Sequence, residues 1–280
     1  MRFASFRRPD GQPSFGLVEG DRIRDCGGQG HADLKAAIAA GALAGLTGPG
    51  DSFALADVVL LPVIPNPDKI LCVGHNYESH RQETGRAKVA HPSIFTRWAD
   101  TLIAHGQPIV RPRASTDLDF EGELAVVIGR GGRAIVAETA LDHVAGYACF
   151  NDASVRDWQW HTTQFTPGKN FPGTGALGPW LVTPDEAGDL ADVRVTTTLN
   201  GQVVQDQPIR DMIFPIAEIV AYVSAFTPLS PGDVIATGTP GGVGAKRTPP
   251  LWMQAGDRVE VAIGHIGTLS NTIIDEAVLD

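Results

Sequence analysis

The sequence lacks the features that mark several large classes of protein. Only three cysteines occur in 280 residues, and they are widely spaced, so neither a disulfide framework nor a cysteine zinc site is indicated. No apolar run approaches the ~20 residues that a membrane span requires. The N-terminal residues lack the apolar core of a secretory signal. We therefore expect Cys26, Cys72 and Cys149 to be buried free thiols in a cytoplasmic protein.

Positive charge is also scarce. The chain has 22 Lys and Arg against 32 Asp and Glu, which gives a formal net charge of −10. Nucleic acids and anionic membranes bind clustered Lys and Arg, so we expect neither as a partner. A small anionic substrate is compatible with this charge, because a bound cation and a few basic side chains can reverse the field locally.

Several motifs of catalysis and phosphate binding are missing. The sequence contains no G-x-S-x-G and no H-E-x-x-H. A glycine-dense run, TGTPGGVGAK, spans residues 237–246, but it is not a P-loop because Ala245 separates Gly244 from Lys246. The run follows an apolar strand pattern. We therefore expect its backbone N–H groups to form a cradle for an anion, with Thr239 contributing a hydroxyl.

The remaining composition is that of an ordinary globular protein, with 43% hydrophobic and 19% charged residues. Short strand patterns and an alanine-rich helix, DLKAAIAAGALAG, precede a proline-punctuated segment, LPVIPNPDK. Beyond it, strand patterns dominate, with Asn200-Gly201 marking a hairpin and a helix expected from Pro215 to just before Pro228. The pattern predicts a small α+β domain at 1–64 and a mixed, β-rich α/β domain at 65–280.

Three carboxylates stand out in the second domain. Glu121 and Glu123 are two residues apart and lead into an apolar strand pattern, so both side chains should leave the same face. Asp152 ends the next apolar segment. Carboxylates this close need a proton, an arginine or a divalent cation between them. A set of three carboxylates favours Mg²⁺ or Mn²⁺ as the bound cation. The alternative to a metal site is that the two glutamates face solvent on a half-exposed strand and Asp152 caps a turn.

A histidine and a glutamate form a second candidate group. His80 and Glu83 are three residues apart, which on a helix places both side chains on one face. A carboxylate beside an imidazole fixes its tautomer and prepares it as a general base. The alternative is an ion pair on an exposed helix.

Basic and amide side chains follow Asp152. Lys169 lies in a loop flanked by glycine and proline, and such loops carry function when a scaffold positions them. Arg156 and Gln159 have the chemistry to bind a substrate's carboxylate and carbonyl. Arg156 has an alternative role, which is to pair with Asp152 or Asp157.

Taken in order, these segments resemble the fumarylacetoacetate hydrolase family. The resemblance covers roughly residues 60 to 276 and is carried by KILCVGHNYESHRQETG, LDFEGELAVVIG, CFNDASVRDWQ, GKNF, GPW, PGDVIATGTPGGVG and GDRVEVAIGHIGTL. It implies a β-roll or β-sandwich catalytic domain after a small N-terminal domain, in a protein that generally forms a homodimer.

The resemblance also implies roles for particular residues. Those it marks are the metal ligands Glu121, Glu123 and Asp152, the active-site lysine Lys169, the His80 and Glu83 pair on a lid helix, and the substrate-contacting Arg156, Gln159 and Thr239. Three departures concern the loops. Pro172 stands where many members have aspartate, and GTGALGPW lacks a proline often found shortly before the final GPW. His75 precedes Asn76 at a position where other residues are frequent in the family.

The activity implied is that of a Mg²⁺- or Mn²⁺-dependent hydrolase. It would cleave a C–C bond in a 2,4-dioxo acid, such as an acylpyruvate, fumarylpyruvate or maleylpyruvate from aromatic catabolism, and release pyruvate and a carboxylic acid. An alternative within the family is a decarboxylase or isomerase of 2-oxo diacids. An alternative from another class is a binding module that uses the cation only for structure.

Overall fold

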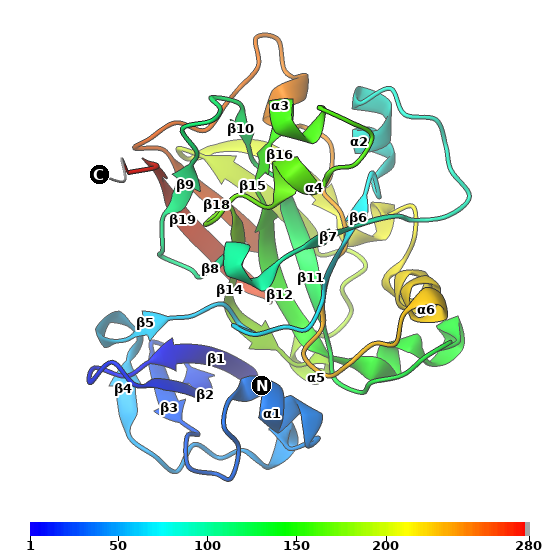
Figure 1. Ribbon diagram of the computed structural model, residues 1–280. Coiled ribbons are helices and arrows are strands. Elements are labelled where there is room, and N and C mark those ends of the chain that lie inside the picture. The colour runs from blue at the N-terminus through cyan, green and yellow to red at the C-terminus, as the bar shows by residue number, and fades with distance from the viewer. Residues whose placement is uncertain (278–280) are drawn as a thin grey trace.

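The computed structural model describes residues 1–277, and it is built mainly of β-strands, as the sequence predicts (Figure 1). A 12-stranded sheet has the order β4-β3-β2-β1-β14-β12-β11-β17-β6-β7, with β5 paired to β1 and β8 paired to β14. A 5-stranded sheet has the order β16-β15-β18-β19-β9, and β10 pairs with β13. Most neighbouring strands are antiparallel, and β17 with β6, β14 with β8 and β19 with β9 are parallel.

The strands are β1 (Arg2–Arg7), β2 (Pro13–Glu19), β3 (Arg22–Asp25), β4 (Ser52–Ala54), β5 (Val59–Leu60), β6 (Ile70–Gly74), β7 (Ser93–Arg97), β8 (Leu102–Ile103), β9 (Ile109–Arg111), β10 (Leu118–Asp119), β11 (Gly122–Ile128), β12 (Val144–Asp152), β13 (Ser154–Val155), β14 (Gly175–Val182), β15 (Arg194–Leu199), β16 (Gln202–Pro208), β17 (Val234–Ala236), β18 (Arg258–Ile263) and β19 (Gly267–Asp275). The α-helices are α1 (Leu34–Ala39), α2 (Glu78–Glu83), α3 (Arg156–Gln159), α4 (Thr166–Lys169), α5 (Pro184–Ala187) and α6 (Ile216–Phe226).

The first 64 residues share a sheet with the rest of the chain. Strand β1 pairs with β2 on one side and with β14 on the other, where Phe3 lies opposite Leu181. Phe3 is buried in the same apolar cluster as Phe150 of β12. The two parts are visible as a lower lobe and a larger upper body in Figure 1. The division at residue 64 stays a prediction, and the large sheet continues across it through the pairing of β1 with β14.

Strand β11 is buried on both faces, which explains its continuous apolar sequence. Leu124 and Val126 face one apolar cluster, whereas Ala125 and Val127 face the other. The strand lies between β12 and β17 in the large sheet. A glutamate at the start of such a strand is therefore carried into the interior of the protein.

The hairpin and the long helix form where the sequence predicts them. Asn200 and Gly201 both have positive φ angles, 52° and 80°, as a tight turn between β15 and β16 requires. Helix α6 starts after Pro215 and buries Val220 and Val223. The alanine-rich helix near the N-terminus is shorter than expected. It ends at Ala39, because Gly41 has a φ of 64° and turns the chain out of the helix.

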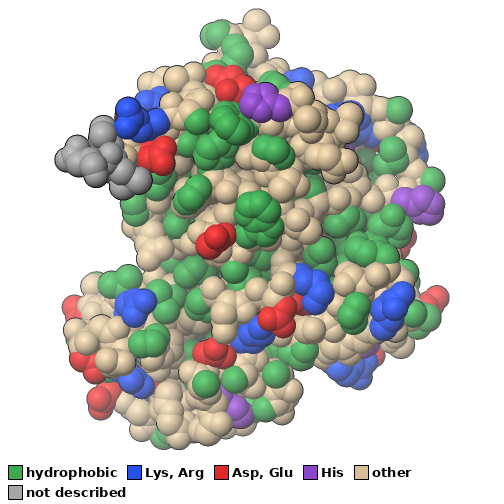
Figure 2. Space-filling view, in the orientation of Figure 1, with side chains coloured by type: hydrophobic (Ala, Val, Ile, Leu, Met, Phe, Trp, Pro, Cys, Tyr) green, Lys and Arg blue, Asp and Glu red, His purple; other side chains and the backbone are tan. Residues whose placement is uncertain are grey.

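The short helices α2, α3 and α4 gather at the end of the large sheet that lies away from the N-terminal lobe (Figure 1). The face of the molecule in Figure 2 carries acidic, basic and apolar side chains interspersed, without one large basic patch. Among the residues that the structure describes, no helix is both long and apolar enough to cross a membrane.

Candidate active site

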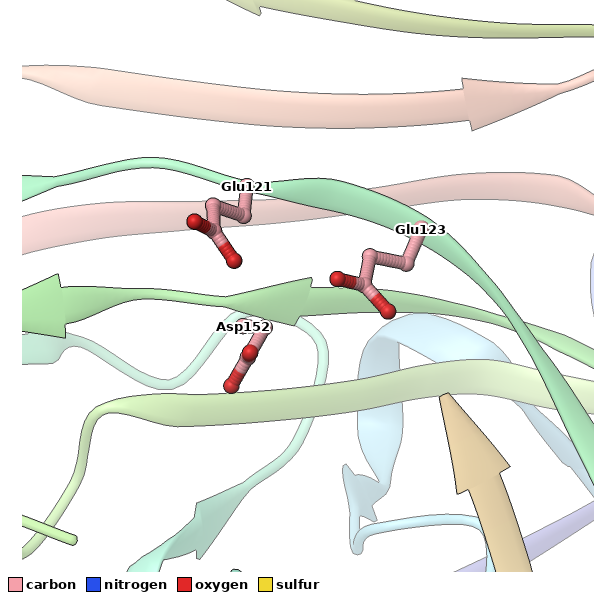
Figure 3. Close-up of side chains that lie close together, drawn as sticks. All are labelled: Glu121, Glu123 and Asp152. Atoms are coloured by element: carbon pink, nitrogen blue, oxygen red, sulfur yellow. The ribbon is translucent and has the colours of Figure 1, made fainter. Parts of the chain in front are cut away.

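Three carboxylates come together at the start of β11 and the end of β12. One oxygen of each of Glu121, Glu123 and Asp152 lies within 4.8 Å of the others, and the side chains share one space between the strands (Figure 3). Their residues are 5%, 2% and 0% exposed. The alternative of a half-exposed strand is therefore wrong.

The two glutamates do not lie in one strand as the sequence suggested. Strand β11 begins at Gly122, so Glu121 belongs to the connection from β10. Its backbone still continues the pairing with β12, because the Asp152 N–H donates to the Glu121 carbonyl at 2.9 Å. Gly122 is required between the glutamates, since a Cβ there would lie 2.1 Å from the Thr197 hydroxyl oxygen.

Three buried cations hold two of these carboxylates, Glu121 and Asp152. Lys169 Nζ donates to Glu121 Oε2 and to Asp152 Oδ2, both at 2.6 Å. Arg97 pairs with the other oxygen of Asp152. Arg156 binds Glu121 Oε1 at 2.7 Å and Asp119 Oδ2 at 2.8 Å. The expected alternative pairing of Arg156 with Asp152 or Asp157 is therefore wrong.

These contacts give the two glutamates opposite properties. Burial alone would raise the pKa of Glu121, but the charges of Lys169 and Arg156 hold it well below its usual value. Burial, together with the charges of Asp152 and Glu121, raises the pKa of Glu123 well above its usual value. Burial would lower the pKa of Lys169, yet the charges of Asp152 and Glu121 raise it. Lys169 is therefore an ammonium group that donates hydrogen bonds.

The charge of the centre fits a divalent cation. The ionisable groups bound into it are the carboxylates Asp119, Glu121, Glu123 and Asp152 and the cations Arg97, Arg156 and Lys169. In the described chain the ion pairs reach every one of these carboxylates except Glu123, whose oxygen accepts only the Gly238 N–H, at 2.8 Å. The deficit of positive charge thus falls on Glu123. A hard cation held by three carboxylate oxygens removes it and leaves positive charge for an anionic substrate.

The glycine-dense loop binds carboxylates of the protein itself rather than presenting an open anion cradle. Asp119 accepts from the N–H groups of Gly244 and Ala245 at 2.8 and 2.9 Å. The Gly242 N–H donates to Glu83 at 2.8 Å. Gly238 has a φ of 103°, and a Cβ there would lie 2.6 Å from the Cβ of Asn76. The loop therefore fixes the carboxylates around the centre.

The His80 and Glu83 pair forms on α2 as predicted, and it is not an exposed ion pair. His80 Nδ1 lies 2.6 Å from Glu83 Oε1, and His80 is only 5% exposed. The His75 ring stacks on the His80 ring at 5.1 Å between centroids. Burial and the neighbouring His80 lower the pKa of His75 to about 4, so His75 is neutral near pH 7.

One pocket of about 100 Å³ brings the predicted residues together. The predicted site residues that line it are His80, Glu121, Glu123, Arg156, Gln159, Lys169 and Thr239. Asp152 and Glu83 do not line the pocket, but each is hydrogen-bonded to a residue that does: Asp152 to Lys169 and Glu83 to His80. The structure thus assembles all nine predicted residues around one space, and their catalytic and binding roles stay predictions.

Three further residues belong to the centre and were not predicted. Arg97 pairs with Asp152, and Asp119 pairs with Arg156. Gln205 donates to Thr239 Oγ1 at 2.8 Å. Asp119 stands in the same sequence run as the glutamates, which is a usable signal.

A different run, GTGALG at residues 173–178, has dinucleotide-motif spacing, but it leads into β14 rather than into a helix. It carries no such site.

Fold and centre together define an enzyme-like protein in which buried carboxylates and a lysine face one small pocket. A family model, fumarylacetoacetate (FAA) hydrolase C-terminal, matches residues 69–274. The chain belongs to the fumarylacetoacetate hydrolase family, which is a family of enzymes.

Three similar proteins have two named activities. An oxaloacetate tautomerase of Xenopus laevis is 40% identical over 220 residues, which are 78% of this chain and 69% of that protein. An oxaloacetate tautomerase of Bacillus subtilis is 42% identical over 225 residues, covering 79% and 75%. The solved fumarylacetoacetate hydrolase of Exiguobacterium antarcticum is 36% identical, with a TM-score of 0.86 over 99% of this chain and 100% of that one.

Proposed function

We propose that this protein is a divalent-metal-dependent enzyme that interconverts the enol and keto forms of oxaloacetate. The observation that carries the proposal is a pocket of about 100 Å³ that is lined by Glu121 and Glu123 of the carboxylate triad and by Lys169 and Arg156. Pockets for drug-sized ligands measure roughly 300–1,000 Å³, so this space favours a short 2-oxo diacid. The names of the two similar tautomerases support the same reaction.

The cationic residues of the pocket would bind and orient the substrate. Arg156 Nη2 is buried and has no hydrogen-bond partner within residues 1–277, so it is available to a substrate carboxylate. Lys169, held as an ammonium group, would stabilise negative charge on the substrate's 2-oxo oxygen. A divalent cation on Glu121, Glu123 and Asp152 would polarise the same carbonyl as a Lewis acid.

His80 is suited to move the proton. Tautomerisation exchanges a proton between C3 and the oxygen on C2, with no other bond made or broken. Glu83 accepts the hydrogen bond at Nδ1 of His80, which leaves Nε2 to exchange a proton with the substrate. In the direction from keto to enol, His80 would remove the C3 proton, and the same proton would be delivered to the oxygen on C2.

The proposal is tested with enol oxaloacetate. Its absorbance is followed with the purified protein, with added Mg²⁺ or Mn²⁺ and with EDTA, while pyruvate is measured in parallel. We expect the protein to accelerate loss of the enol without forming pyruvate, EDTA to abolish the acceleration, and added metal to restore it. Equal rates with and without protein would contradict the proposal.

A second candidate is hydrolysis of a C–C bond in a 2,4-dioxo acid, and the buried His80 and Glu83 pair favours it. The same pair would deprotonate a water that attacks the distal carbonyl, and the pyruvate enolate would leave. Similarity to the Exiguobacterium hydrolase supports this candidate. The products distinguish hydrolysis from tautomerisation, because hydrolysis of an acylpyruvate would give pyruvate and a carboxylic acid in equal amounts.

Homodimer assembly and a cytoplasmic location also stay predictions.

Changing His80 to glutamine is expected to lower kcat by about 10²- to 10⁴-fold, because general acid–base catalysis contributes on this scale. His80 is not in the carboxylate triad, so the rise in melting temperature on adding Mn²⁺ should be retained. Gln82→Ala is the control, since this residue of α2 is exposed, does not line the pocket, and donates its side-chain hydrogen bond to Glu78. Full activity in His80→Gln would exclude the proposed proton transfer.

A further inference from the structure

Two basic side chains line the outer part of the site pocket, and the chemistry described above uses neither. Arg86 follows α2, and Lys246 lies in the glycine-dense loop. Both residues are exposed, unlike the buried Lys169 and Arg156. They are 160 positions apart in the sequence, and both line this pocket.

Aromatic rings hold both head groups at the pocket. The guanidinium carbon of Arg86 lies 5.9 Å from the centroid of the Phe165 ring. Lys246 Nζ lies 5.3 Å from the centroid of the Trp160 ring. Both rings also line the pocket. Cation–π contacts of this kind restrict a cation to the face of a ring without neutralising its charge.

Neither cation has an acidic partner in the part of the chain that the structure describes. Some other basic residues of this acidic protein do have one. Arg111 pairs with Asp275 at 2.7 Å, and Arg194 pairs with Asp206 at 2.6 Å. Two uncompensated cations that line one pocket, each held against an aromatic ring of that pocket, mark a place for an external anion.

We infer that Arg86 and Lys246 form a second carboxylate subsite, which selects 2-oxo acids that carry another carboxylate at the far end. The inference rests on the proposed function for its substrate class. The carboxylate triad, with its cation, Lys169 and Arg156 would take the 2-oxo acid end. The outer pair takes the opposite end, so the pocket prefers dianions over monoanions of the same length.

The test uses two ligands that differ only at the far end. 2-Oxoglutarate and 2-oxopentanoate have the same five-carbon 2-oxo acid skeleton, and only the first has a distal carboxylate. Binding of each is measured by calorimetry in the presence of Mn²⁺, for the wild type, Arg86→Gln, Lys246→Gln and the double variant. Lys88→Gln is the control, because it removes the same charge from the loop after α2 at a residue that does not line the pocket.

We expect the wild type to bind 2-oxoglutarate more tightly than 2-oxopentanoate. Each pocket substitution should weaken 2-oxoglutarate about fivefold, the factor that corresponds to ~1 kcal/mol for an exposed ion pair. Neither should change 2-oxopentanoate, and Lys88→Gln should resemble the wild type. A preference that survives in the double variant, or no preference in the wild type, would overturn the subsite.

Turnover separates this inference from the proposed reaction. If oxaloacetate is a substrate, Arg86→Gln and Lys246→Gln should raise its KM and leave kcat nearly unchanged, because the distal carboxylate does not react. A protein that prefers 2-oxoglutarate but does not convert oxaloacetate retains the subsite and loses the proposed reaction. A protein that converts oxaloacetate without preferring the dianion has the reaction and lacks the subsite.

Discussion

Replacing Glu123 by glutamine should abolish metal-dependent turnover without destabilising the metal-free protein. Glu123 is the triad member whose charge no cation of the described chain balances. Glutamine keeps the size of the side chain and an oxygen for the Gly238 N–H. Because the pKa of Glu123 is raised well above its usual value, glutamine resembles the protonated side chain of the metal-free protein, and the substitution removes one of three metal ligands. We expect activity to fall at least ~10³-fold, as when electrostatic stabilisation of the transition state is lost.

Two measurements check this expectation. In EDTA, the melting temperature of Glu123→Gln should equal or exceed that of the wild type. Added Mn²⁺ should raise the melting temperature of the wild type and leave the variant nearly unchanged. Glu260→Gln is the matched control, because Glu260 is half-buried and pairs with Arg258 outside the pocket. Wild-type activity in Glu123→Gln would show that the triad does not hold the catalytic cation.

The large elements could be predicted because their sequence patterns are local. The apolar run of β11 and the Asn200-Gly201 turn each determine their conformation within a few residues. The position of Glu121 could not be predicted in this way. Its pattern resembles that of a strand residue, but the side chains of Asn151 and Lys169 bind it where β10 passes into β11.

The triad was also visible in the sequence, since acidic residues beside buried strands are rare enough to indicate a site. Its supporting residues were not. Arg97 is an ordinary basic residue at the end of β7 until the fold places it against Asp152. The loop at 237–246 has the composition of an anion-binding loop, and it does bind anions. That these are Asp119, Glu83 and Glu123 depends on long-range contacts that no local pattern contains.

Replacing Lys169 by methionine should lower the stability of the metal-free protein and raise its affinity for a divalent cation. Changing it to methionine leaves Glu121 and Asp152 without their shared ammonium partner, while most of the side-chain volume is kept. Breaking a buried ion pair by removing one partner costs about 3–5 kcal/mol, so the metal-free variant should unfold at lower denaturant. The site then attracts a divalent cation more strongly than before, because the ammonium group that repels the cation and competes for the carboxylates is gone. Mn²⁺ should bind more tightly.

These effects distinguish Lys169 from a residue that only stabilises the fold. Denaturant unfolding in EDTA and in Mn²⁺ should show that metal restores more stability to Lys169→Met than it adds to the wild type. Turnover should stay very low even in saturating Mn²⁺, since the substrate's 2-oxo oxygen loses its ammonium donor. Lys69→Met is the control: Lys69 pairs with the buried Asp233 at 2.9 Å outside the pocket. Its loss of stability should be the same with and without metal. Weaker Mn²⁺ binding in Lys169→Met would mean that the lysine organises the triad for the cation and does not compete with it.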